Sequence, residues 1–179
     1  MEYYDIDDII ADSQRLPVKF QISVPGLGYL EGNPGKQVSK DSRMELPLWL
    51  ALILAICPID DSEDSGQNFV ELLPPEFLSA KVQNAIKSSP ATIDLHSILP
   101  HFYNFVVKWC WLFEDAQLVQ LCLDMLRERA AEINSRSSNS TARQNLDQIN
   151  KLDEFEKRIF KLNYDSFKDL KQWLAAQHP

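Results

Sequence analysis

The hydrophobic pattern of this 179-residue chain changes its period once, at Pro47. Before that point, apolar and polar residues alternate over 18–24, which is the period of a half-buried β-strand. After it, apolar residues recur every three or four positions, which is the period of an amphipathic α-helix. The sequence therefore predicts a mainly α-helical protein in which a small β-rich N-terminal domain precedes a helical domain, an α+β organisation overall.

The β-rich domain is predicted over residues 1–46. Its expected elements are a short helical turn within 3–12, the strand at 18–24, a second short strand at 27–30, and one or two more strands within 37–46. Because so few strands bury little apolar surface, this domain should rest against another part of the protein or against a partner.

The helical domain is predicted over residues 47–179. Helices are expected at 48–56, 75–88, 100–114, 116–134 and 146–176, with a short helical turn at 93–99, an acidic loop at 58–68 and a flexible serine-rich linker at 135–145. The first helix is apolar nearly all round, which predicts a central position. The last helix keeps its apolar stripe for about eight turns. Such a helix outruns the core of a domain this size, so its remainder is expected to meet a partner.

The charge argues against direct binding to nucleic acid. The formal net charge is −8, and the densest basic run, Lys157 to Lys161, is interleaved with glutamates. A protein that binds phosphate backbones usually carries a basic patch. The negative excess lies in the first half of the chain, so a basic partner surface is expected to dock there.

The sequence lacks the patterns that carry common enzyme chemistry. GxGxxG, GxxxxGK and GxSxG are all absent. A zinc quartet can be drawn from His96, His101, Cys110 and Cys122, but no CxxC or HxxxH pair anchors it. We therefore expect no catalytic residue, no metal site and no cofactor, and we expect the cysteines to be free thiols. A small helical enzyme with an unfamiliar site is the alternative of a different class, and activity of the isolated chain would support it.

Four tryptophans stand at helical spacing among leucines, which predicts mostly core positions. Trp109 and Trp111 cannot both face inward, because residues two apart point to different sides of a helix. One of the pair is therefore expected to meet another helix or another chain, where tryptophan is a common anchor.

Several segments, taken in order, resemble one family. They are YYDIDDI at 3–9, PGLGYL at 25–30, LPLWLA at 46–51, FVELLPP at 69–75, DLHS at 94–97, KW at 108–109 and KQW at 171–173. In their order and spacing over essentially the whole chain, they are similar to the third-subunit family of the eukaryotic GINS complex, especially its fungal versions.

The resemblance implies a non-catalytic, nuclear protein without cofactors. GINS is a heterotetramer of four related small subunits, each with a helical A domain and a β-rich B domain. The B domain comes first in this family, as the change of period predicts. The complex joins the hexameric MCM ring and a RecJ-like cofactor to form the active replicative DNA helicase. Partners are thus expected to be the three other subunits, the MCM ring and the RecJ-like protein, with no sequence-specific nucleic acid contact and no membrane.

A partner interface is predicted on the helices at 116–134 and 146–176, and the N-terminal acidic segment and strand 18–24 are predicted to place the small domain. The residues expected at these contacts are Tyr3, Tyr4, Asp5, Phe20, Trp111, Leu118, Met125, Phe155, Ile159, Leu162 and Trp173. A helical adaptor of another nuclear complex would bury the same faces, so it stays open as the alternative on physical grounds alone.

Overall fold

The computed structural model describes residues 4–59, 68–139 and 149–177. The chain divides into two compact units, Met1–Ser79 and Ala80–Pro179. Each unit is described by itself below. The predicted domain boundary between residues 46 and 47 falls inside the first unit; as a functional division it stays a prediction.

The first unit is built on a three-stranded antiparallel sheet with strand order β2-β1-β3. Its elements are α1 (Ile6–Asp12), β1 (Arg15–Phe20), η1 (Gly28–Glu31, a 3₁₀ turn), β2 (Arg43–Pro47), α2 (Leu48–Ile56), β3 (Val70–Leu72) and η2 (Glu76–Leu78, a 3₁₀ turn). The alternation predicted over 18–24 holds for Val18 and Phe20, which point into the core, as does the preceding Leu16. Val18 and Phe20 pack there with Val38, Leu46, Ala51 and Val70.

Two strand predictions in this unit were wrong. The strand expected at 18–24 ends at Phe20, and Val24 instead forms an isolated bridge with Val38. The strand expected at 27–30 is the 3₁₀ turn η1, because Gly28 donates to the Lys36 carbonyl and accepts from the Asn33 N–H, which closes a tight loop. A Cβ at Gly28 would lie 2.4 Å from both carbonyl oxygens, of Asn33 and Lys36, so the loop requires glycine there.

Helix α2 is not central, contrary to the prediction from its composition. Only Leu48 and Ala51 are buried, whereas Trp49, Ile53 and Ile56 are each more than half exposed. These three follow one another at spacings of four and three, so they form a single outward face. A helix that is apolar all round gives no sequence-based means of choosing which face the core takes.

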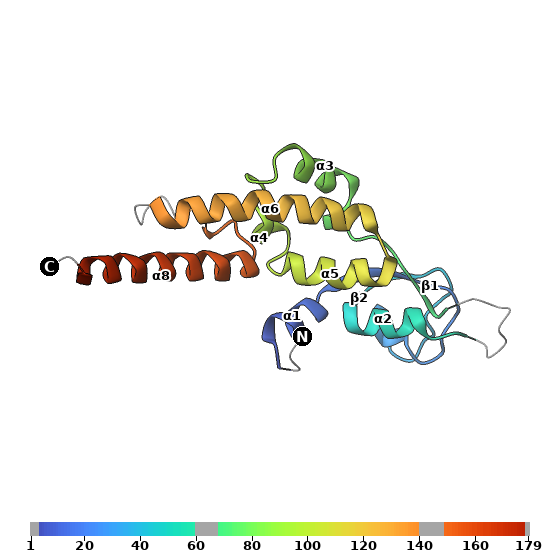
Figure 1. The fold of residues 1–179 in the computed structure, drawn as a ribbon. Coiled ribbons are helices and arrows are strands. Elements are labelled where there is room, and N and C mark those ends of the chain that lie inside the picture. Colours follow the sequence, from blue (N-terminus) through green and yellow to red (C-terminus); the bar gives the residue numbers. More distant parts are fainter. Residues whose placement is uncertain (1–3, 60–67, 140–148, 178–179) are drawn as a thin grey trace. The chain divides into compact units, whose positions relative to one another are not determined.

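The second unit is a bundle of helices around α6 (Figure 1). Its elements are α3 (Ala80–Ser88), α4 (Leu95–Ile98), α5 (Phe102–Phe113), α6 (Ala116–Asn139) and α8 (Glu154–Gln177). Helix α6 contacts α3, α5 and α8. The core contains Ile86, Leu95, Phe102, Phe105, Trp109, Leu118, Met125 and Ile133.

Helix α6 runs five residues further than predicted, into the segment expected to be a linker. The hydroxyls of Ser137 and Ser138 both donate to the Asn134 carbonyl within the helix, which satisfies these polar side chains without ending it. The rest of the expected linker, from residue 140, lies outside the described residues, as does most of the acidic loop expected at 58–68. None of the described helices is both long and apolar enough to cross a membrane.

Candidate partner interface

A groove of about 300 Å³ separates α5 from α6, and apolar side chains line most of it. Helix α5 contributes Val106, Val107 and, one turn later, Cys110. Helix α6 contributes Val119, Cys122, Leu123 and Leu126, and Phe155 at the start of α8 also lines the groove. Val107, Val119 and Leu123 are between 39% and 57% exposed, so no described residue of the second unit covers the groove.

Trp111 extends this surface along α5. It lies four residues after Val107, which places both on the same helix face, and it is 80% exposed. Its neighbour Trp109 is buried and stacks between Phe105 and Phe113, with ring centroids 6.0 and 4.3 Å away. The prediction that the two cannot both face inward is confirmed. The prediction that the tryptophans lie mostly in the core is wrong, because Trp49, Trp111 and Trp173 are each more than half exposed.

Phe155 also begins an exposed stripe along α8. The stripe continues at spacings of three, four or eight residues, through Ile159, Leu162, Leu170 and Trp173, so these side chains share one face. Phe155, Leu162, Leu170 and Trp173 are 41%, 69%, 50% and 56% exposed, and Ile159 is half-buried. We call the groove, Trp111 and this stripe together the apolar face of the second unit.

Three residues predicted at the interface belong to the core instead. Phe20, Leu118 and Met125 are at most 2% exposed, so their side chains cannot reach a partner in this conformation. The sequence placed them on the correct elements but on the wrong side, because helical periodicity identifies an apolar face without showing what covers it.

The N-terminal predictions have mixed outcomes. Tyr3 lies outside the described residues, and Tyr4 is 83% exposed. Asp5 is the N-cap of α1, where its carboxylate accepts from the Asp7 N–H at 3.1 Å. That bond satisfies one of the free amides at the helix start, which gives Asp5 a local structural role. A role for Tyr4 and Asp5 in partner contact stays a prediction.

Sequence reasoning missed the groove residues Val107, Val119 and Leu123 and the outward face of α2. The i, i+4 pairs Val107–Trp111 and Val119–Leu123 carry a signal for a second apolar side on each helix. That signal was available but cannot separate core from interface until the packing of α5 on α6 is known.

A buried ionic network holds the start of α8 in the second unit. Arg129 of α6 donates from Nε and a terminal guanidinium nitrogen to the two carboxylate oxygens of Glu156, at 2.6 and 2.7 Å. Its other terminal nitrogen donates to the carbonyls of Pro90 and Ile93 at 3.0 and 2.9 Å. The hydroxyl of Tyr103, on α5, donates to Glu156 at 2.9 Å. Arg129 and Glu156 are almost completely buried.

Asp153 caps two helices at once. One of its oxygens accepts from the Phe155 N–H at the start of α8, and the other accepts from the Phe102 N–H at the start of α5. Glu156 in turn accepts from the Asp153 N–H at 3.2 Å, which completes a capping box around the first turn of α8. The helix that carries the exposed stripe is therefore tied at its base to both α5 and α6.

In this network, burial disfavours the charged forms of Asp153 and Arg129, whereas their hydrogen-bond partners favour those forms. Burial raises the pKa of Asp153 to about 6, although its backbone donors favour the ionised form. For Arg129, burial lowers the pKa, but the hydrogen bond and charge of Glu156 outweigh it and leave the pKa raised. Burial, followed by the charge of Glu156, raises the pKa of Tyr103, so its hydroxyl keeps its proton and its donor role.

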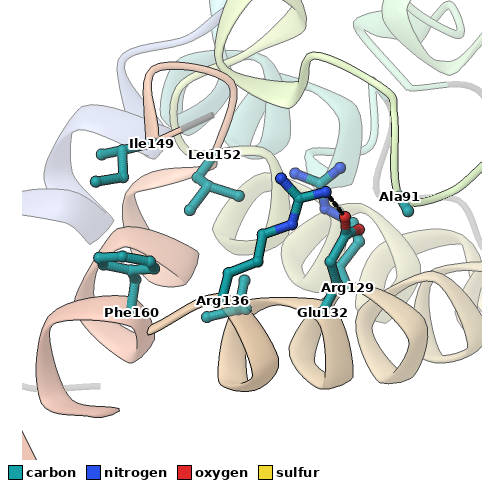
Figure 2. A pocket seen from close by; sticks show the side chains of 8 residues that line it. Ala91, Arg129, Glu132, Arg136, Ile149, Leu152 and Phe160 are labelled. Atoms are coloured by element: carbon teal, nitrogen blue, oxygen red, sulfur yellow. Dashed lines mark hydrogen bonds and ion pairs between the residues drawn. The ribbon is translucent and has the colours of Figure 1, made fainter. Parts of the chain in front are cut away.

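A small pocket beside this network has no room for a substrate. Its volume is about 20 Å³, which is close to the space that one water requires. Figure 2 shows Arg136 and Glu132 paired on α6, opposite Ile149, Leu152 and Phe160. Within residues 4–59, 68–139 and 149–177, no buried side-chain nitrogen or oxygen lacks a hydrogen-bond partner. No three His, Cys, Asp or Glu residues of that part of the chain could together hold a metal ion. The largest feature of the second unit that is open to solvent is thus its apolar face.

Two family models match the chain and together cover most of it. The model of the PSF3 N-terminal domain matches residues 4–56, and the model of the GINS complex protein helical bundle domain matches residues 77–175. The first match falls within the first compact unit, and the second lies almost wholly within the second unit.

Curated fungal proteins are similar over nearly their full length. The protein from Debaryomyces hansenii is 51% identical over 172 residues, which cover 96% of this chain and 97% of the relative. The protein from Kluyveromyces lactis is 48% identical over 99% of this chain and all of its own length. The protein from Saccharomyces cerevisiae is 43% identical over 97% of this chain and 98% of its own. Each is named DNA replication complex GINS protein PSF3.

Proposed function

The chain belongs to the PSF3 family of GINS complex proteins, and on that premise we propose that it is a non-catalytic structural subunit of a GINS heterotetramer that acts in DNA replication. The names of its relatives supply the complex and the process. The observation that carries the structural role is the apolar face of the second unit, which no described residue of that unit covers.

The physical argument rests on how much apolar side chain this face exposes. Trp111, Leu162 and Trp173 are all more than half exposed. Burying apolar surface is favourable by about 25 cal/mol per Å², and monomeric proteins rarely expose large contiguous apolar patches. A face built from a groove and a long helical stripe is the kind of surface that obligate subunit interfaces bury. The three other GINS subunits are the partners that we propose for it.

The groove between α5 and α6 has a shape suited to a helix. Helices α5 and α6 each line it with residues spaced three or four apart along one side, most of them apolar, and such grooves bind the apolar face of an amphipathic helix. We propose that a helix of another GINS subunit occupies it. The related subunits have helical domains by the family resemblance, so each could supply such a helix.

The proposal extends to the larger helicase assembly. We propose that the GINS complex containing this chain joins the MCM ring and a RecJ-like cofactor, and that it works in the nucleus. The resemblance to the family supports this step. The acidic α1 and the exposed face of α2, both on the first unit, are additional surfaces for such contacts.

Cysteine labelling tests the proposed occupant of the groove. Cys110 is half-buried and lines the groove, whereas Cys57 caps the end of α2 in the other unit. The rate at which maleimide modifies each thiol is measured by peptide mass spectrometry, in the free chain and in the assembled complex. We expect modification of Cys110 to slow strongly on assembly, because a docked helix would exclude the reagent.

Assembly of a Leu123→Asp variant provides a second test of the groove. The substitution places a charge on an exposed groove wall, so the chain should fold but assemble less well. If Cys110 reacts at the same rate in the free chain and in the complex, the groove is not the subunit interface, even where a complex forms.

A further inference from the structure

Helix α8 packs along α6, but its fully buried residues lie at or just before its first turn. Residues 152, 153 and 156 are buried, but no residue between 161 and 176 is. The later turns touch α6 through residues that are at most half-buried, such as Asn163 and Phe167, so they constrain the direction of the helix less than the buried base does. In Figure 1 the C-terminal end of α8 extends past the end of α6.

A small change in the angle of α8 at its base moves the far end of the exposed stripe by a large distance. From Glu156 to Leu174 the helix rises about 27 Å at 1.5 Å per residue, so a tilt of about 10° at the base would move Leu174 by about 5 Å. A shift of that size is larger than the tolerance of a packed interface, where side chains interdigitate as they do in a core. Assembly therefore requires α8 to have a defined direction, and the exposed residues of its later turns contribute little to fixing that direction.

The Arg129–Glu156 pair is suited to fix a direction rather than to add stability. Removing two charges from water costs free energy. The attraction between the charges of a buried pair often only offsets this cost, so the pair adds little net stability. The guanidinium is planar, and its contacts with Glu156 and with the Pro90 and Ile93 carbonyls constrain it in several directions. Apolar contacts at the same place would tolerate rotation and sliding, whereas this set of bonds has one geometry.

We propose that Arg129 and Glu156 are positioning residues for assembly, which set the angle at which α8 presents its apolar stripe to the other subunits. The inference rests on the proposed function, because it assumes that the stripe is an interface. It assigns the network a role in specifying the docking geometry, separate from holding the unit folded.

Two variants separate direction from stability. The apolar variant combines Tyr103→Phe, Arg129→Met and Glu156→Leu, so that no charge or phenol hydroxyl stays buried without its partner. Arg129→Lys keeps the positive charge but loses the planar fork, and it serves if the apolar variant does not fold. The control, Arg127→Gln with Asp124→Asn, removes an exposed ion pair of the same helix.

Two measurements report on the variants. Electron–electron distance spectroscopy measures the spread of α8 directions in the full chain, with spin labels at exposed residues 127 and 168 and with the three native cysteines replaced by alanine. For the control pair, the first label moves to exposed residue 128. Competition measures assembly: each variant is co-expressed with a mass-tagged wild-type chain and limiting amounts of the three other GINS subunits, and native mass spectrometry gives the ratio incorporated.

We expect both variants to fold, to broaden the distance distribution, and to lose incorporation on the order of tenfold through lost pre-organisation. The control should match the wild type in both measurements. Equal incorporation of variant and wild type would overturn the inference, as would reduced incorporation with an unchanged distance distribution. If the wild-type chain itself fails to enter a complex, the proposed function fails, and the distance distributions still decide whether the network sets the direction of α8.

Discussion

Two tryptophans separated by one residue on α5 have opposite surroundings. Trp109 is 7% exposed and stacks on Phe105 and Phe113, whereas Trp111 is 80% exposed. Helical geometry requires that they point to different sides. The same residue type therefore serves the core at one position and, by our proposal, a partner at the other.

These two positions should respond oppositely to substitution. Trp109→Ala should lower the free energy of unfolding by about 3–5 kcal/mol, because it leaves a cavity in the core. Trp111→Ser should change that free energy by no more than about 0.5 kcal/mol, as for other surface substitutions. Urea unfolding of the full chain measures both.

In a measurement of assembly, the substitution at Trp111 should have the larger effect. Trp111→Ser should weaken association with the other GINS subunits by about 2 kcal/mol or more if it is an interface anchor. A Trp111→Ser chain that competes with the wild type for assembly on equal terms would remove Trp111 from the interface.

At the scale of elements, the helical period located the long helices well. The expected helices at 100–114 and 116–134 correspond to α5 and α6, and the last expected helix, 146–176, corresponds to α8, which begins eight residues later than expected and ends at Gln177. Periodicity succeeded there because long segments repeat the pattern several times. It failed for the three-residue strand β3, which pairs with β1 and is too short to show a period.

The ionic network shows where sequence reasoning stops. Asp153 and Glu156 stand at the spacing of a capping box, so the start of α8 near residue 154 was available from the sequence. Their partner Arg129 is 27 residues away from Glu156, in the middle of another helix. Nothing in the sequence marks it as buried, because arginines at such positions usually extend into solvent.

The Asp153 cap predicts a pH dependence of stability. In the folded chain its pKa is about 6, above the ordinary value of 3.8. The folded state therefore binds this proton more tightly, so the stabilising contribution is complete below about pH 4 and is lost as pH rises through about 6. The loss is at most about 3 kcal/mol, at about 1.4 kcal/mol per pKa unit.

Comparison with Asp153→Asn isolates this group from every other carboxylate. The free energy of unfolding is measured by urea denaturation at intervals from pH 4 to pH 7 for both proteins. The wild type should lose more stability over this interval than the variant does, whatever their absolute difference. Parallel curves for the two proteins would show that Asp153 is ionised throughout and that its backbone donors dominate over burial.

At the scale of the whole molecule, both compact units leave apolar helix faces in solvent. The first unit exposes Trp49, Ile53 and Ile56 on α2, and the second exposes the groove and the α8 stripe.

The sequence predicted the mainly helical fold and the early β-rich sheet. It also predicted that the last helix would have an unpartnered side. It could not divide apolar residues between core and surface, because that division depends on which helices meet. A chain with such faces should be poorly soluble or self-associating by itself.

Native mass spectrometry of the chain, expressed alone and then with the three other GINS subunits, tests the central claim most directly. The account predicts a stable complex with one copy of each subunit, and a lone chain that folds but self-associates as its concentration rises. A soluble, well-behaved monomer that ignores those three partners would contradict it.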